Sequence, residues 1–162
     1  MLSTLKPQID ELDQAVERAA YANERARLLM TQPGVGPITS LAFVITMGDV
    51  TRFANGKQVS SYLGLVPSEH SSSNRRRLGS ISKQGSPFLR MLLVESVQTV
   101  CRLDEGFRKQ YKHRCHRWKK GVAKVAAARK LAVRLYWMLR TNTAYPEIDH
   151  IEGSPRVGMV GR

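Results

Sequence analysis

Serine hydroxyls and arginine guanidiniums gather in one short stretch, residues 64–85, which reads GLVPSEHSSSNRRRLGSISKQG. The stretch holds six serines and one histidine, and Arg75, Arg76 and Arg77 follow one another. A serine that attacks a phosphodiester must lose its proton while charge develops on the phosphoryl oxygens, and clustered guanidiniums can stabilise that charge. These residue types therefore suit phosphoryl transfer, although a solvated basic loop has the same composition.

The serines nearest to the arginines are the candidate nucleophiles. Ser71, Ser72 and Ser73 come just before the arginine run, with only Asn74 between. His70 is close enough in sequence to act as their general base or acid. Composition does not choose among the three serines, because serine-rich segments are commonly just turns.

Metal chemistry has little support in this sequence. His113, Cys115 and His116 lie close together, but ligands on one face of a helix need three or four residues between them, so only the two histidines could pair. Residues 31–140 hold five carboxylates, without the paired spacing that two magnesium ions require. We expect no metal site and no cofactor in this chain.

Positive charge is concentrated in the middle of the 162 residues, whose formal net charge is +13. Residues 52–140 carry 20 basic and four acidic side chains, a net +16. Such a block attracts polyanions and predicts salt-sensitive binding of nucleic acid. No apolar stretch is long enough to span a membrane. Two cysteines and the lack of a signal-peptide pattern indicate a cytoplasmic protein without disulfides.

Helices are expected on both sides of the serine-rich loop, in a mainly α fold. Over residues 2–30, apolar residues recur at alternating spacings of three and four, which predicts a coiled-coil helix and a homo-oligomer formed through it. Pro7 suits a first turn, so this helix is expected to begin near Lys6. Asn23 occupies a seam position of the coiled coil. The alternative is a single amphipathic helix that packs on its own domain.

The turn at residues 31–37, TQPGVGP, resembles a helix-hairpin-helix. Gly34 and Gly36 allow unusual backbone conformations, and Pro37 suits the start of the next helix, expected over 38–47 and buried nearly all round. Backbone amides at such a helix start can bind a DNA phosphate. A plain tight turn between packed helices is the alternative.

Further helices complete a domain predicted over residues 31–140. They are expected over 57–63, from Ser86 as the capping residue, over 107–120 and over 122–140. The segment 107–120 is basic, with aromatic residues at Phe107, Tyr111 and Trp118, and would hold DNA or RNA. Residues 141–162 are predicted to be a disordered tail.

The order of these motifs along the chain resembles that of a known protein family. The order PGVGPITS, GDVTRF and SSYLGLVPSEHSSSNRRRLGSISKQGSPFLRMLLVESV strongly resembles the C-terminal serine domain of bacterial insertion-sequence transposases that also have an N-terminal DEDD domain. These enzymes are described as bridge-RNA-guided recombinases, and the match covers roughly residues 28–103. The resemblance implies DNA transposition, a helical fold with a preceding coiled coil, and DNA and a guide RNA as partners.

The resemblance also implies roles for individual residues. It identifies Ser72 as the nucleophile that becomes covalently linked to DNA. The family usually has glycine at the next position, where this chain has Ser73, so Ser71 and Ser73 remain alternatives. It assigns Arg75 to Arg77 and Lys83 to phosphate binding.

The resemblance further implies that Mg²⁺ acts only through a DEDD domain, which these 162 residues lack. A non-catalytic DNA- or RNA-binding remnant of a truncated transposase is therefore the alternative function.

Overall fold

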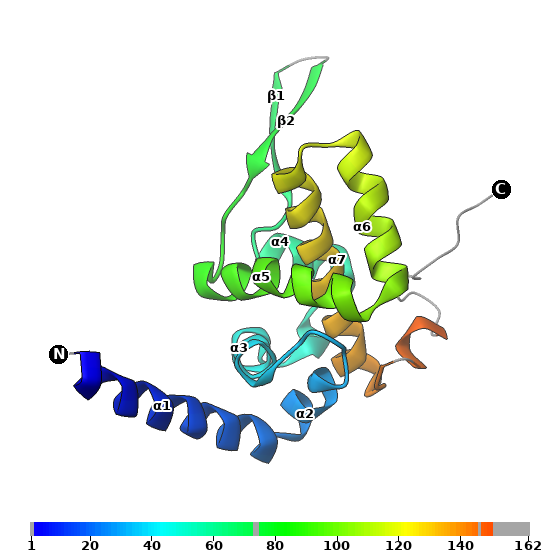
Figure 1. Cartoon of the computed structure of the whole chain (residues 1–162). Coiled ribbons are helices and arrows are strands. Elements are labelled where there is room, and N and C mark those ends of the chain that lie inside the picture. Colours follow the sequence, from blue (N-terminus) through cyan, green and yellow to red (C-terminus); the bar gives the residue numbers. More distant parts are fainter. Residues whose placement is uncertain (1, 73–74, 146, 151–162) are drawn as a thin grey trace.

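The computed structural model describes residues 2–72, 75–145 and 147–150; for residues 2, 3, 68–72, 75–79, 149 and 150 it describes the backbone alone. This part of the chain contains seven α-helices, two short 3₁₀ helices and one antiparallel pair of strands (Figure 1). The prediction of a mainly α fold is confirmed. None of the helices in the described ranges is long and apolar enough to cross a bilayer.

The N-terminal helix differs from the prediction because it is broken at Asn23. Helix α1 spans Leu2–Ala22 and helix α2 spans Glu24–Met30. The Asn23 side chain accepts a hydrogen bond from the Ala26 amide at 3.0 Å, so this residue caps α2 instead of continuing a coiled-coil seam. Helix α1 also begins before Lys6 and contains Pro7 in its interior. It extends from the other helices as an arm (Figure 1).

Helix α7, Lys120–Thr141, lies at the centre of the packing. It contacts α5 (Pro87–Leu103), α4 (Gly56–Tyr62), α2 and α6 (Glu105–Arg117). The core is built from fully buried apolar side chains of several helices, among them Phe43, Leu93, Leu131 and Tyr136. Each such side chain contributes roughly 1.5–3 kcal/mol through its removal from water, so this cluster holds the helices around α7.

Helix α3, Pro37–Met47, is less buried than its apolar composition predicts. Its contacts are with α1, α2 and α5, which leave one side uncovered. Ile45 is consequently 70% exposed and Ile38 is 43% exposed. The prediction that this helix is buried nearly all round is therefore wrong.

Capping residues set the other helix boundaries. The predicted cap Ser86 accepts a hydrogen bond from the Leu89 amide at 3.2 Å, and Asn55 caps α4 in the same way through the Gln58 amide at 3.0 Å. Helix α6 begins at Glu105, two residues earlier than predicted, because the Asp104 side chain caps it through the Phe107 amide at 2.8 Å. A 3₁₀ helix, Val50–Arg52, joins α3 to the segment before α4.

The first part of the expected tail packs against the helices. After α7 the chain forms a 3₁₀ helix, Glu147–His150, in which Ile148 is fully buried. The Tyr145 amide donates a hydrogen bond of 3.0 Å to the Thr31 hydroxyl. Residues 151–162 of the predicted tail lie outside the described part of the chain.

Candidate active site

The predicted Ser- and Arg-rich loop is a β-hairpin in the structure. Strand β1 spans Pro67–Ser72 and strand β2 spans Arg75–Ile81, and the pair projects from the helices (Figure 1). The sequence prediction of a loop is corrected here. Because the hairpin stands out from the helical core, its polar composition does not have to be buried.

The strand register brings the serines and arginines opposite one another. The paired positions are Ser72 with Arg75, Ser71 with Arg76, and His70 with Arg77. The alternative nucleophile Ser73 lies outside the described residues. Between Leu78 and Ile81 strand β2 has one more residue than its partner strand, a bulge that bends the hairpin near its base.

The hairpin is joined to the helices by a tightly closed neck. Gly64 and Gly85 both have positive φ angles, +68° and +78°. A Cβ atom at Gly64 would lie 2.2 Å from the carbonyl oxygen of Gln84, and one at Gly85 would lie 2.3 Å from that of Tyr62. Only glycine allows the two ends of the hairpin to approach this closely.

Backbone hydrogen bonds close the same neck. The Lys83 amide donates to the Gly64 carbonyl at 3.1 Å, and the Ser82 amide donates to the Val66 carbonyl at 2.9 Å. Lys83, a predicted phosphate ligand, has a φ of +55° and an exposed side chain at this neck, apart from the arginine-bearing part of the hairpin. The hydroxyl of Ser82 is buried, which removes it from the set of serines that could reach DNA.

Arg90 of helix α5 ties the two ends of the hairpin together. Its Nη1 donates to the Leu63 carbonyl at 3.3 Å and to the Gln84 carbonyl, so that one guanidinium binds the chain on both sides of the neck. This role of Arg90 was not predicted from the sequence. The only signal is an arginine in the first turn of a helix that directly follows the SKQG motif.

The two glycines of the predicted helix-hairpin-helix have different surroundings. Gly34 packs against helix α5, because a Cβ there would lie 2.6 Å from the Val100 amide nitrogen. Gly36 is exposed at the start of α3, with no atom near the position of a Cβ. Gly34 therefore serves the packing of the turn on α5, whereas Gly36 leaves the first turn of α3 accessible to solvent.

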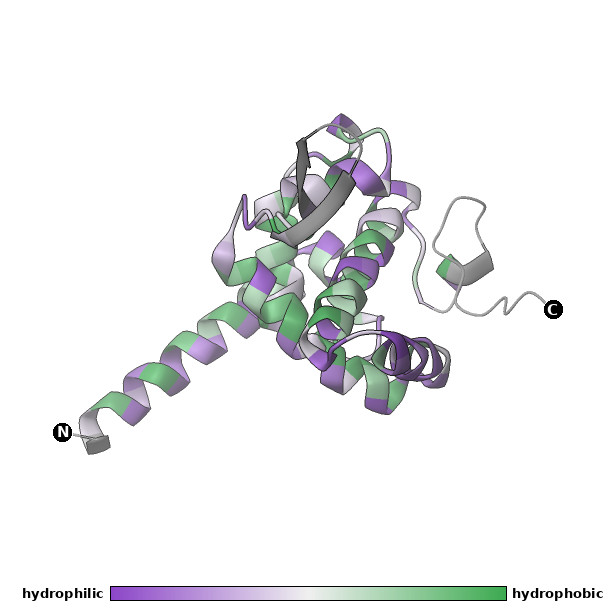
Figure 2. Ribbon diagram, turned by 90° about the horizontal axis from the view of Figure 1, so that it is seen from above, coloured by the Kyte–Doolittle hydropathy of each residue, from purple (hydrophilic) through white to green (hydrophobic). Residues whose placement is uncertain are grey.

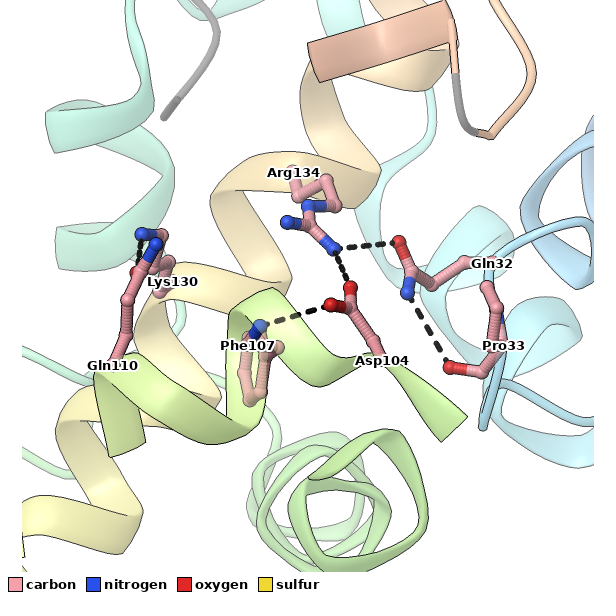
Figure 3. Close-up of polar contacts among 7 residues, drawn as sticks. All are labelled: Gln32, Pro33, Asp104, Phe107, Gln110, Lys130 and Arg134. Carbon is pink, nitrogen blue, oxygen red and sulfur yellow. Dashed lines mark hydrogen bonds and ion pairs between the residues drawn. The ribbon is translucent and has the colours of Figure 1, made fainter. Parts of the chain in front are cut away.

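A buried ion pair and its hydrogen bonds connect α7 with the start of α6 and with the turn after α2. Arg134 of α7 donates to Asp104 at 2.9 Å and to Gln32 at 3.1 Å, and all three side chains are buried (Figure 3). Asp104 also caps α6, and Gln32 belongs to the turn after α2. This buried group was not predicted from the sequence, although a lone arginine on the apolar face of α7 is a signal for it.

The described residues contain no cluster of three or more side chains able to hold a metal ion. His113, Cys115 and His116 lie on α6.

Comparison with known proteins places the glycine turn and the hairpin in a family. The sequence profile of the transposase IS116/IS110/IS902 family matches residues 26–112, which include the turn, the neck, the hairpin and α5. The chain belongs to this transposase family.

Individual relatives agree with that membership. The chain is 32% identical over 148 residues to a "Probable family 20 transposase" of Pseudomonas aeruginosa and 36% identical over 94 residues to the transposase for insertion sequence element IS1111A of Coxiella burnetii. It is also 31% identical over 131 residues to the pilin gene-inverting protein of Moraxella bovis.

These alignments cover different shares of the two chains compared. They include 89%, 58% and 79% of this chain, but 44%, 26% and 41% of the respective relatives. The chain thus spans less than half the length of these relatives.

Proposed function

We propose that this chain is the part of a DNA transposase that carries a serine nucleophile, and that Ser72 is this nucleophile. The register of the hairpin supports the choice. Paired positions share a face and faces alternate along a strand, so positions 70, 72, 75 and 77 belong to one face, and 71 and 76 to the other. Ser72 thereby shares its face with one histidine and two arginines, whereas Ser71 shares its face with Arg76.

The chemistry is a transesterification at phosphorus. The Ser72 oxygen forms a bond to the phosphorus of a DNA phosphodiester, the bond from phosphorus to one deoxyribose oxygen breaks, and that oxygen leaves as a hydroxyl. His70 accepts the serine proton and returns one to the leaving oxygen. Arg75 and Arg77 bind the phosphoryl oxygens as charge develops on them. Attack by another DNA hydroxyl then releases the serine, so the reaction consumes no nucleotide.

The neck gives this mechanism a fixed base. Gly64, Gly85 and the Arg90 guanidinium hold the two ends of the hairpin against α5. A nucleophile must stand about 3–3.5 Å from the phosphorus to react efficiently, and a hairpin that swings freely would lose that positioning. The neck therefore positions the serine without touching the substrate.

We also propose partners and a further domain. Leu5, Ile9 and Leu12 share one face of α1 by their spacing and are each at least half exposed, which supports pairing of α1 with the same helix of a second copy. Hydrophobic and hydrophilic residues both colour this helix in Figure 2. DNA is the substrate by this proposal. A guide RNA, and Mg²⁺ bound by an acidic domain supplied separately from these residues, stay predictions from the family resemblance.

A trapping assay for covalent DNA adducts tests the proposal, in a transposase that contains this chain together with a DEDD domain. Ser72→Ala should abolish the adduct. Arg75→Ala and Arg77→Ala should each reduce its rate at least tenfold, and Arg76→Ala, the matched control on the opposite face, should have a smaller effect. Undiminished adduct in Ser72→Ala would refute the assignment. Salt-sensitive DNA binding without any adduct in the unsubstituted protein would favour a binding remnant instead.

A further inference from the structure

Helix α6 presents an almost entirely hydrophilic, basic surface. Phe107 is the one side chain of this helix that is buried, while Arg108, Lys109, Lys112 and Arg117 are exposed. The hydropathy colouring shows α6 as a largely purple helix (Figure 2). Phe107 and the partly buried Tyr111 pack this helix against the core, which leaves its charged face available to a partner.

The charge of this region has few acidic counterparts. Residues 106–146 contain 12 lysines and arginines and no aspartate or glutamate. Glu105 pairs with Lys109 at 2.9 Å, and Glu95 of α5 lies 3.9 Å from Lys124. Burial lowers the pKa of Arg114, and the nearby charge of Arg129 on α7 lowers it further. Positive charge is therefore crowded where α6 and α7 meet, and a polyanion would relieve this crowding.

Trp118 stands at the end of this basic helix, in the connection to α7. It is 48% exposed, although tryptophan is among the side chains that gain most from burial. Its sequence neighbours His116, Arg117, Lys119 and Lys120 are all exposed. The connection lies at the end of the molecule toward which the hairpin projects (Figure 1).

We propose that the end of α6 and the α6–α7 connection bind a single-stranded segment of nucleic acid, with Trp118 stacked on an unpaired base and Arg117, Lys119 and Lys120 on its phosphates. Stacking requires the face of a base, which a continuous duplex does not offer. Basic residues alone would fit a duplex equally well. The exposed indole is the feature that favours a single strand over a duplex. The inference does not depend on the serine chemistry.

Fluorescence titration of the full chain tests this surface. The chain has two tryptophans, so Trp137→Phe leaves Trp118 as the only reporter. Oligonucleotides of about ten thymidines or ten uridines should quench its fluorescence on binding. Comparison of the two oligonucleotides distinguishes DNA from RNA as the ligand, and tighter binding of either one supports the site.

Substitution of the tryptophan separates stacking from charge. In a fluorescence-anisotropy assay with labelled oligonucleotides, Trp118→Ala should weaken single-strand binding by about 5- to 150-fold and leave the salt dependence unchanged. Lys119→Ala should instead reduce the slope of log affinity against log salt by about 0.7. Tyr21→Ala removes another exposed aromatic side chain, 58% accessible, from α1 and is the matched control that should bind normally.

Two results would overturn the inference. One is single-strand affinity in Trp118→Ala equal to that of the unsubstituted chain. The other is an equal loss of affinity for single-stranded and blunt duplex DNA, because this would assign the residue to duplex binding. Circular dichroism should show that Trp118→Ala folds normally, as expected for a half-exposed side chain. Phenylalanine at this position should restore most of the binding.

Discussion

Replacing Gly64 with alanine tests how strongly the neck depends on the close approach of its two ends. Gly64 has a φ of +68°, and a Cβ there would lie 2.2 Å from the oxygen and 2.4 Å from the nitrogen of the Gln84 backbone. A left-handed conformation costs an L-residue about 1–2 kcal/mol. Forcing an extra methyl group into packed atoms costs about 1–3 kcal/mol more. The neck should therefore be destabilised by roughly 2–5 kcal/mol.

Hydrogen exchange measures this effect where it occurs. The Lys83 amide donates to the Gly64 carbonyl, so its protection reports the closed neck. In Gly64→Ala this amide should exchange at least about 30-fold faster, the factor that corresponds to the lower end of the expected destabilisation. The core helices should keep most of their protection, and the yield of covalent DNA adduct should fall.

Two other glycines provide matched controls. Gly48 has a φ of +58° with no atom near the position of a Cβ, so Gly48→Ala carries the backbone cost alone. Gly36 has a φ of −94° and the same open space, so Gly36→Ala carries neither cost. The expected order of destabilisation is Gly64, then Gly48, then Gly36. If Gly64→Ala is no more destabilising than Gly48→Ala, the close approach at the neck is not what holds the hairpin.

Three further predictions test other parts of the structure. Asp104→Asn keeps the cap of α6 but removes the carboxylate that pairs with buried Arg134. Urea denaturation should show that the free energy of unfolding falls by about 3–5 kcal/mol. Adding Arg134→Met to this variant should recover much of the lost stability. Burial raises the pKa of Cys101, with smaller contributions from Asp104 and Cys115. In Cys115→Ser, which leaves Cys101 as the one thiol, alkylation should therefore reach its plateau at a higher pH than alkylation of free cysteine. A plateau at the same pH would contradict this. Ile9→Gln with Leu12→Gln should convert an oligomer into a monomer in sedimentation, without loss of helical signal from residues 31–140; unchanged sedimentation of an oligomer would place its interface elsewhere.

Local signals allowed several helices to be predicted from the sequence. Pro37 and Ser86 mark the starts of α3 and α5 within one residue, because caps and first-turn prolines act over a few neighbouring positions. At Asn23 the prediction of an uninterrupted helix is wrong. Its spacing fits a coiled-coil seam, but the asparagine gains a hydrogen bond by capping α2, and this local bond ends α1.

Local signals in the sequence do not predict the hairpin or the buried ion pair. Residues 67–81 are polar at almost every position, so neither face shows the alternation that identifies a strand. Their pairing depends on the neck, where Gly64 meets Gln84 across 20 residues of chain. Arg134 and Asp104 are likewise 30 residues apart, and only the packing of α7 against the start of α6 brings them together.

The nucleophile itself can be identified by mass spectrometry of the trapped protein–DNA adduct. The assembled transposase is reacted with cleavable DNA, the adduct is digested with protease and nuclease, and the residue that carries the nucleotide remnant is located by fragmentation. The remnant should be found on Ser72, the position that shares a hairpin face with Arg75 and Arg77. A remnant on Ser71, on Ser73 or on a residue outside the hairpin would contradict the proposed mechanism.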